Sequence, residues 1–182
     1  MSETHNESLT FEKVWAALME TRERQEETAR QMKETDRKIG RLGNRFGELA
    51  EHLVTPGIVE KFNDLGYEFT RHSRDTEFKD PKTGRNVAEV DIFLENGDIV
   101  IAVEVKTNLR TEDVNNHISR MEVLRRLADA RSDSRTYRGA VAGAILTNQT
   151  RAYAHDAGLY VIEQSGDTMK LDIPEGFVPR DW

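Results

Sequence analysis

The chain has 182 residues, of which 37% are hydrophobic and 32% are charged, and its formal net charge is −7. This size favours one domain with an appendage, and the composition is too apolar for a wholly disordered chain. The absence of cysteine excludes disulfides, thiolate zinc sites and a cysteine nucleophile. The longest aliphatic stretches are far shorter than the roughly 18 residues that a membrane span needs. Residues 1–10 carry neither the basic nor the apolar region of a secretory signal, so we expect a soluble, cytoplasmic protein that begins with a disordered tail.

Residues 11–42 carry a heptad repeat, in which seam residues alternate at spacings of three and four: Phe11, Val14, Leu18, Thr21, Gln25, Thr28, Met32, Thr35, Ile39 and Leu42. Good helix formers fill the other positions, so this spacing predicts a coiled-coil arm that drives self-association. The threonines and the glutamine weaken the middle of the seam, and the alternative is a helix that packs on its own domain. The charged residues beside the seam leave the strand number and orientation open.

The arm ends in glycines at positions 40, 43 and 47, which indicate a hinge or a site of close packing. We expect a helix to continue over residues 46–54 and to break at Thr55-Pro56, because proline suits the first turn of a new helix. That new helix is expected to end at Leu65-Gly66. The globular domain is therefore predicted to span residues 43–182.

The stretch 87–107 contains two β-rich runs on either side of Asn96-Gly97, which is a strong hairpin signal. A two-residue turn at this position predicts four pairs on one apolar face of the hairpin. The expected pairs are Leu94–Ile99, Ile92–Ile101, Val90–Val103 and Ala88–Val105.

Periodicity and turn signals predict further elements around this hairpin. The expected strands cover residues 67–71, 139–146, 159–163 and 169–173, and the expected helices cover residues 111–128 and 150–157. This order of helices and strands predicts an α/β core around a mixed sheet.

The second face of the hairpin carries Asp91, Glu104 and Lys106, charged residues that natural strands seldom bury on a sheet face. Two converging carboxylates form the oxygen-rich kind of site that Mg²⁺ takes together with water and substrate phosphate. A lysine beside them can orient or deprotonate a bound water and can stabilise negative charge on a phosphate. The pattern fits a ladder of surface ion pairs equally well.

The spacing Asp91, twelve residues, Glu104-Val105-Lys106 resembles the D-x(n)-E-x-K signature of the PD-(D/E)XK, or restriction-endonuclease-like, nuclease superfamily. Val90 stands where that motif often has proline. Glu51 is similar to the helical glutamate of archaeal Holliday-junction resolvases. The wider pattern resembles an uncharacterised bacterial family that joins a coiled-coil arm to this core. The stretches that carry this resemblance are 42–48, 89–91, 96–98, 104–107, 139–143, 158–162 and 177–182.

The resemblance implies a restriction-endonuclease-like fold and a metal-dependent nuclease that hydrolyses phosphodiester bonds, with DNA favoured as the substrate. It implies Mg²⁺ as the cofactor, with Mn²⁺ as a substitute. In this reading Asp91, Glu104 and the carbonyl of Val105 hold the metal. Lys106 is the catalytic base or the group that orients water, and Glu51 supports the metal through water.

Two other carboxylates compete for roles at this site. Glu48 is the alternative to Glu51, and Glu89 is a possible extra carboxylate on the same face as Asp91. The alternative function is a catalytically silent nuclease fold that acts as a scaffold or a nucleic-acid-binding module. The complete set of Glu51, Asp91, Glu104 and Lys106 favours the enzyme.

The net charge gives no general attraction for nucleic acid. The segment 120–138, however, contains six arginines and only three acidic residues, which is a local excess of positive charge. Arg120, Arg125, Arg126 and Arg131 are therefore the candidate contacts with nucleic acid. His117 lies on the apolar stripe of the same predicted helix and is expected to be partly buried or on the surface rather than a metal ligand.

Overall fold

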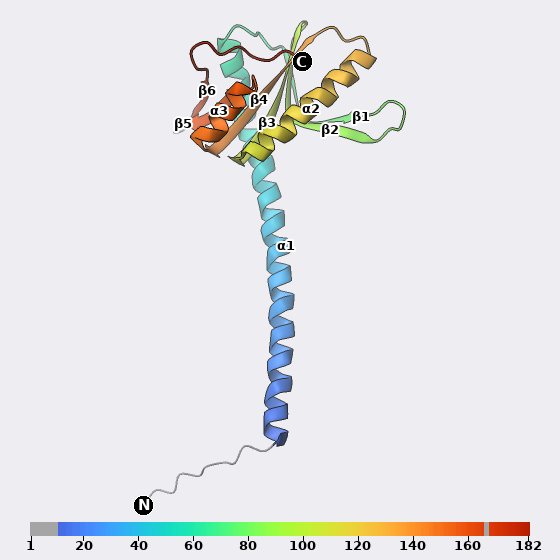
Figure 1. Cartoon of the computed structure of the whole chain (residues 1–182), viewed down its shortest axis with the longest axis vertical. Coiled ribbons are helices and arrows are strands. Elements are labelled where there is room, and N and C mark those ends of the chain that lie inside the picture. The colour runs from blue at the N-terminus through green and yellow to red at the C-terminus, as the bar shows by residue number, and fades with distance from the viewer. Residues whose placement is uncertain (1–10, 166–167) are drawn as a thin grey trace, which may run out of the picture. The chain divides into compact units, whose positions relative to one another are not determined.

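A computed structural model describes residues 11–165 and 168–182, and for residues 39–54 and 168 it describes the backbone alone. The chain divides into two compact units, Met1–Arg45 and Phe46–Trp182. Helix α1, Phe11–Asp64, contributes residues to both units (Figure 1). Its backbone is helical through the glycine-containing stretch and through Pro56, so the break predicted at Thr55-Pro56 is wrong.

The reason for this continuity lies in the turns that follow the proline. Pro56 removes one backbone N–H and therefore weakens the helix. Ile58 and Phe62, which lie in the next two turns, are fully buried in the core of the second unit. Burial of an apolar face supplies most of the stability of helices in proteins, so it offsets the missing bond.

In the first unit, the helix exposes the apolar residues of its predicted seam. Phe11 is 78% exposed, and Val14, Leu18 and Met32 are exposed as well. The hydroxyls of Thr21 and Thr28 donate to the carbonyls one turn earlier, at 2.7 and 2.8 Å. These bonds satisfy both hydroxyls within the helix. The side chains of Ile39 and Leu42 lie outside the described residues.

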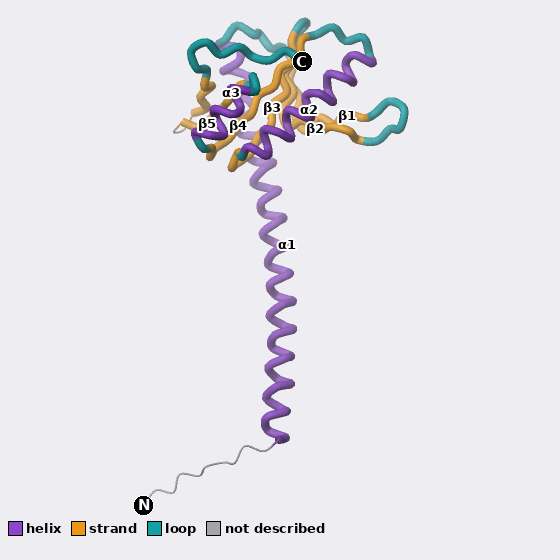
Figure 2. Tube along the Cα trace, in the orientation of Figure 1, coloured by secondary structure: helices purple, strands orange, loops and turns teal. Residues whose placement is uncertain are grey.

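In the described part of the second unit, six strands form one sheet in the order β1-β2-β3-β4-β5-β6 (Figure 2). Strands β3, β4 and β5 run parallel and the other neighbours pair antiparallel, which confirms the predicted mixed sheet. The helices that follow β3 and β4 are α2 and α3. The bounds are β1 Arg71–Lys79, β2 Asn86–Glu95, β3 Ile99–Leu109, α2 Thr111–Ala130, β4 Thr136–Leu146, α3 Asn148–Asp156, β5 Tyr160–Ser165 and β6 Thr168–Asp172.

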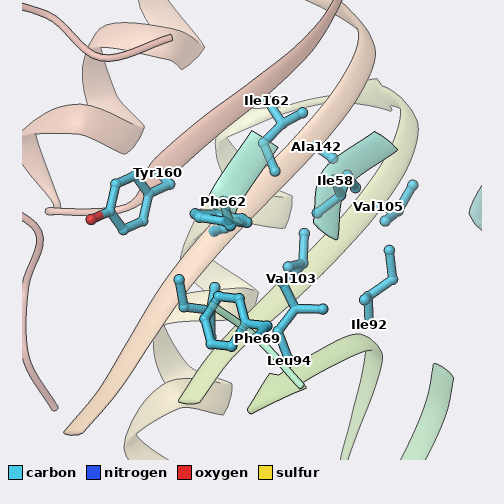
Figure 3. Close-up of a cluster of buried hydrophobic side chains, with 12 residues drawn as sticks. Ile58, Phe62, Phe69, Ile92, Leu94, Val103, Val105, Ala142, Tyr160 and Ile162 are labelled. Carbon is cyan, nitrogen blue, oxygen red and sulfur yellow. The ribbon is translucent and has the colours of Figure 1, made fainter. Parts of the chain in front are cut away.

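Helices pack on both faces of this sheet. Ile58 and Phe62 of α1 pack on one face, against alternate residues of the four inner strands and against Phe69 (Figure 3). Helices α2 and α3 pack on the opposite face, where Met121 and Leu124 meet Val100 and residues beside it. The β3-α2-β4 connection thus places α2 directly over the strand that carries the predicted site. No helix among the described residues is long and apolar enough to cross a bilayer.

The register of the β2–β3 hairpin differs from the prediction by two residues. Leu94 pairs with Ile101 and Ile92 pairs with Val103, so four residues separate the paired Glu95 and Val100. The side chain of Asn96 accepts the backbone N–H groups of Asp98 and Ile99 at 2.9 and 2.8 Å, which stabilises this longer turn. A shift of two residues keeps each side chain on its face.

On the N-terminal side of Ile92, strand β2 separates from β3. Ala88 and Val90 pack in the cluster beneath α2, whereas Ile92 packs in the cluster on the opposite face. The predicted pairs Val90–Val103 and Ala88–Val105 are therefore wrong. On the other side of β2, the neighbouring Asp75 has a positive φ of 47°. These irregularities meet at Asp91.

The strand predicted over residues 67–71 is a loop, and β1 begins only at Arg71. Side chains take the place of a strand partner there. The amide oxygen of Asn63 accepts the N–H of Phe69 at 2.7 Å, and Asn96 donates to the carbonyl of Tyr67 at 2.6 Å. The other predicted elements are present, with bounds that differ by a few residues.

Candidate metal centre

The ammonium group of Lys106 lies between two carboxylates. Its Nζ is 2.7 Å from Oε1 of Glu104 and 3.9 Å from Oδ2 of Asp91. Glu104 and Lys106 are two residues apart on β3, so they share a face of the strand. Asp91 comes from β2 at the point where the two strands separate. The structure therefore brings together the three residues that the sequence predicted on one face.

Backbone geometry fixes the position of Asp91. Its Oδ2 accepts the N–H of Val105 at 2.7 Å, just beyond the last β2–β3 pair, Ile92–Val103. The carboxylate takes the place of a strand carbonyl as hydrogen-bond acceptor. The side chain of Val105 packs in the core cluster on the opposite face.

The two carboxylates differ in their electrostatic state. Burial, together with the nearby negative charge of Glu104, raises the pKa of Asp91 to about 6. Burial alone would raise the pKa of Glu104 too, but the hydrogen bond from Lys106 and the charge of Arg120 hold it below its usual value. Burial alone would lower the pKa of Lys106, yet its hydrogen bond to Glu104 and the charges of both carboxylates raise it. Lys106 is therefore held as an ammonium ion.

A second cation reaches Glu104 from α2. Nη1 of Arg120 donates to Oε2 of Glu104, which leaves Oε1 to Lys106. The Glu104 side chain is only 4% exposed, against 23% for Arg120 and 40% for Lys106. Each oxygen of this buried carboxylate thus has its own cation.

His117 lies one turn before Arg120 on the buried side of α2. The imidazole is fully buried, and its Nε2–H donates to the carbonyl of Ala102 on β3 at 3.0 Å. Burial lowers the pKa of His117 to about 4. The expectation of a partly buried or surface histidine is therefore wrong, because α2 packs closer to the sheet than the helical pattern alone indicates. His117 links α2 to the strand that carries Glu104 and Lys106.

The donor set suits a small divalent cation. Asp91 and Glu104 offer anionic oxygens close enough together for one ammonium nitrogen to contact both. Among the side chains that the structure describes, no three His, Cys, Asp or Glu residues gather as a metal-binding group. Mg²⁺ is commonly held by one or two carboxylates with water and substrate phosphate, so this pair is sufficient.

The sequence also predicts three further carboxylates for this site, Glu51, Glu48 and Glu89. Glu51 and Glu48 belong to α1, and their side chains are outside the described residues. Glu89 is exposed on β2 and lies opposite Glu77 of β1. Their roles stay predictions.

The four candidate arginines have different surroundings. Arg120 binds Glu104, as described above. Arg125 donates to the carbonyls of Asp133 and Arg135 at 2.7 and 2.9 Å and thereby holds the loop that follows α2. Arg126 and Arg131 are exposed. The geometry thus leaves two of the four free to meet a phosphate backbone.

Sequence reasoning did not assign Arg120 to Glu104. One signal was available: Arg120 follows His117 by three positions and therefore lies beside the buried stripe of the helix. A helix that connects two neighbouring parallel strands packs back on those strands. Together these rules place Arg120 above β3.

Comparisons with known proteins match parts of the chain. A family described as "Protein of unknown function (DUF3782)" matches residues 9–76. No curated protein matches the chain.

Similar solved structures include a repair endonuclease from Pyrococcus abyssi, at 15% identity and a TM-score of 0.39 over 58% of this chain and 46% of that one. Protein VC1899 from Vibrio cholerae is 21% identical, with a TM-score of 0.43 over 64% of this chain and 30% of that one. The EndoMS–dsDNA2 complex is 18% identical, with a TM-score of 0.36 over 58% and 44%. This chain therefore spans less than half the length of each of these three proteins.

Proposed function

We propose that this protein is a metal-dependent nuclease that hydrolyses phosphodiester bonds, with DNA as the favoured substrate. One observation carries the proposal: the Lys106 ammonium lies between the carboxylates of Asp91 and Glu104, two oxygen donors from adjacent strands. A surface ladder of ion pairs does not account for this arrangement, because the Glu104 side chain is only 4% exposed.

Each residue has a chemical role in this proposal. Asp91 and Glu104 hold Mg²⁺, with the carbonyl of Val105 as a third oxygen donor. When bound, the cation would act as a Lewis acid towards the phosphate and would increase the acidity of a water molecule bound to it. Lys106, held as an ammonium ion by the two carboxylates, orients water and offsets charge on the phosphate. Its raised pKa favours this role over that of a general base. Glu51 is proposed to support the metal through water.

Contacts with nucleic acid are proposed to come from exposed cations beyond the metal pair. Arg126 and Arg131 are exposed on α2 and on the loop that follows it. Arginine binds phosphate with two parallel hydrogen bonds, so such residues give affinity and fix register without reading sequence. A substrate chosen by structure or by ends suits this arrangement.

The arm is proposed to assemble the protein. Phe11, Val14, Leu18 and Met32 expose apolar surface at heptad spacing, and this surface becomes buried when helices of two or more copies pack together. Ion pairs one turn apart, such as Lys38–Glu34 at 2.8 Å, support each helix separately. Self-association would place several nuclease domains in one particle.

The alternative function is a silent scaffold or nucleic-acid-binding module, and one observation favours it. Both oxygens of Glu104 are already bound by cations of the protein itself, Lys106 and Arg120. Such a carboxylate is electrostatically satisfied without a metal. The two functions therefore differ in one measurable property, which is the binding of a divalent cation.

The deciding experiment is a calorimetric titration of the full chain with Mg²⁺ and Mn²⁺, followed by cleavage assays on linear, nicked and branched DNA and on RNA. The nuclease proposal expects cation binding and cleavage that Asp91→Asn abolishes. Glu77→Gln, which removes an exposed carboxylate of the same sheet, is the matched control and should behave as wild type. Failure of the wild type to bind either cation at millimolar concentration overturns the proposal and leaves the scaffold.

A further inference from the structure

We propose that Arg120 is an exchangeable counter-ion: it neutralises Glu104 in the metal-free protein and moves to a phosphate of the nucleic acid when a divalent cation binds Glu104. This inference rests on the proposed function and adds a residue that couples metal binding to nucleic-acid binding. Arg120 touches a proposed metal ligand in the present structure, so it is not simply one of several surface arginines.

The first step is the occupancy of Glu104. Lys106 binds Oε1 and Arg120 binds Oε2, so a divalent cation that reaches this carboxylate meets a positive charge at either oxygen. Like charges at such distances repel strongly inside a protein, where the effective dielectric constant is far below that of water. Binding of the cation therefore favours the departure of one of the two side chains.

The second step is which side chain leaves. Lys106 is held by two carboxylates, since its Nζ lies 2.7 Å from Glu104 and 3.9 Å from Asp91. Arg120 belongs to a different element, α2, and among the described residues Glu104 is the partner that binds its guanidinium. It therefore loses one ionic contact on departure, whereas Lys106 would lose two. Arg120 is therefore the cation that exchanges.

The third step is where the guanidinium goes. A released guanidinium beside a metal centre has its strongest available partner in a phosphate, because its planar donors match two phosphate oxygens. Metal binding thereby supplies one additional cation for the substrate. By linkage, nucleic acid must then increase the affinity for the metal by the same factor.

The experiment measures Mg²⁺ affinity by calorimetry in the absence of nucleic acid for wild type, Arg120→Gln and Arg85→Gln. Arg120→Gln removes the competing charge, so it should bind Mg²⁺ more tightly by about 5- to 150-fold, the usual range of coupling between sites. Arg85→Gln changes the net charge equally from an exposed position just before β2 and should bind as wild type. An Arg120→Gln protein that binds Mg²⁺ as weakly as wild type, or more weakly, overturns the inference.

The second measurement uses the wild-type protein and does not depend on the folding of a variant. The guanidinium NMR signal of Arg120, assigned through its side-chain correlation to the sequence-assigned backbone of Arg120, should show slow solvent exchange without metal and faster exchange when Mg²⁺ is added. If the signal is unchanged in a protein that does bind Mg²⁺, the proposed movement of Arg120 away from Glu104 is overturned and the nuclease proposal stands. A wild type that binds no cation instead overturns the nuclease proposal itself.

The third measurement follows nucleic-acid affinity by fluorescence anisotropy with and without Ca²⁺, another cation that takes oxygen ligands. Ca²⁺ should increase the nucleic-acid affinity of wild type and of Arg85→Gln by a larger factor than that of Arg120→Gln. Equal factors for all three proteins contradict the transfer of Arg120 to phosphate.

Discussion

The backbone N–H of Val105 donates a 2.7 Å hydrogen bond to the carboxylate of Asp91. One side chain thus accepts a hydrogen bond where β2 leaves β3 and offers an oxygen to the proposed metal. These two tasks place different demands on the residue, because the hydrogen bond needs only an oxygen acceptor whereas the metal needs charge. Substitutions can therefore separate them.

Asp91→Asn should keep the acceptor for Val105, lose metal binding, and stabilise the metal-free protein. The pKa of Asp91 is about 6 in the folded protein, above its ordinary value of 3.8. The unfolded chain therefore releases this proton first, and wild-type stability should fall as the pH rises from about 4 through 6. The Asp91→Asn protein lacks this loss of stability, so at pH 7 it should be more stable than wild type by on the order of 1–3 kcal/mol.

The measurement for Asp91 is urea unfolding in a chelator between pH 4 and pH 8. Asp91→Ala is the comparison that also removes the hydrogen-bond acceptor, and it should be less stable than Asp91→Asn throughout. Equal pH dependence in wild type and Asp91→Asn would show that Asp91 does not titrate in this range.

His117→Gln should remove a different pH dependence. Burial lowers the pKa of His117 to about 4, below its ordinary value of 6.5. Because the unfolded chain takes up the proton first, wild-type stability should fall as the pH drops from about 6.5 towards 4. Glutamine can still donate to the carbonyl of Ala102 but does not titrate. Urea midpoints of wild type should therefore fall more steeply than those of His117→Gln, whereas the exposed His72→Gln should follow wild type.

Lys106→Met and Glu104→Gln should impair different steps, the first cleavage alone and the second both metal binding and cleavage. Methionine keeps the stem and both carboxylates, so the metal should still bind while cleavage falls by roughly 10²–10³-fold, as for loss of one group that stabilises charge in the transition state. Glu104→Gln removes a ligand charge, so metal binding and cleavage should both be lost. Calorimetry and single-turnover cleavage measure the two effects, and a Lys106→Met protein that cuts at the wild-type rate would refute the role of Lys106.

Leu18→Glu should break the assembly of the arm, since it places a charge in the apolar seam between helices. Ala16→Glu introduces the same side chain at an exposed position outside the seam and is the matched control. Light scattering at micromolar concentration should show an oligomer for wild type and Ala16→Glu and a smaller species for Leu18→Glu. Removal of residues 1–40 should likewise leave a smaller folded species. A monomeric wild type would refute self-association.

Arg126→Gln and Arg131→Gln should each flatten the salt dependence of DNA binding. Loss of one phosphate contact reduces the slope of log affinity against log salt by about 0.9. Arg125→Gln should leave the slope unchanged and destabilise the fold, because Arg125 holds the carbonyls of Asp133 and Arg135. Anisotropy titrations at several salt concentrations distinguish these results, and a reduced slope for Arg125 alone would contradict the assignment.

The shared face of Glu104 and Lys106 could be predicted, because it depends only on alternation along β3. Asp91, Glu104 and Lys106 stay together although the register of the hairpin is shifted by two residues. Local pattern did not predict the separation of β2 from β3, because it depends on a side chain that replaces a backbone acceptor.

The continuity of α1 and the contact between Arg120 and Glu104 depend on tertiary packing. Pro56 is a helix breaker by local rules, and burial of Ile58 and Phe62 reverses its effect. Arg120 meets Glu104 because α2 folds back over β3, which no local pattern in either segment specifies.

Two cations of the protein occupy the buried Glu104 carboxylate, and this arrangement has a consequence for how the chain responds to its surroundings. Lys106 and Arg120 neutralise the buried Glu104 carboxylate, so folding should not require a divalent cation. This differs from domains that are unfolded without their metal. Chelation should switch the proposed activity off without unfolding the protein, and returning the cation should restore it. The supply of the divalent ion then acts as a reversible control on a domain that stays folded throughout.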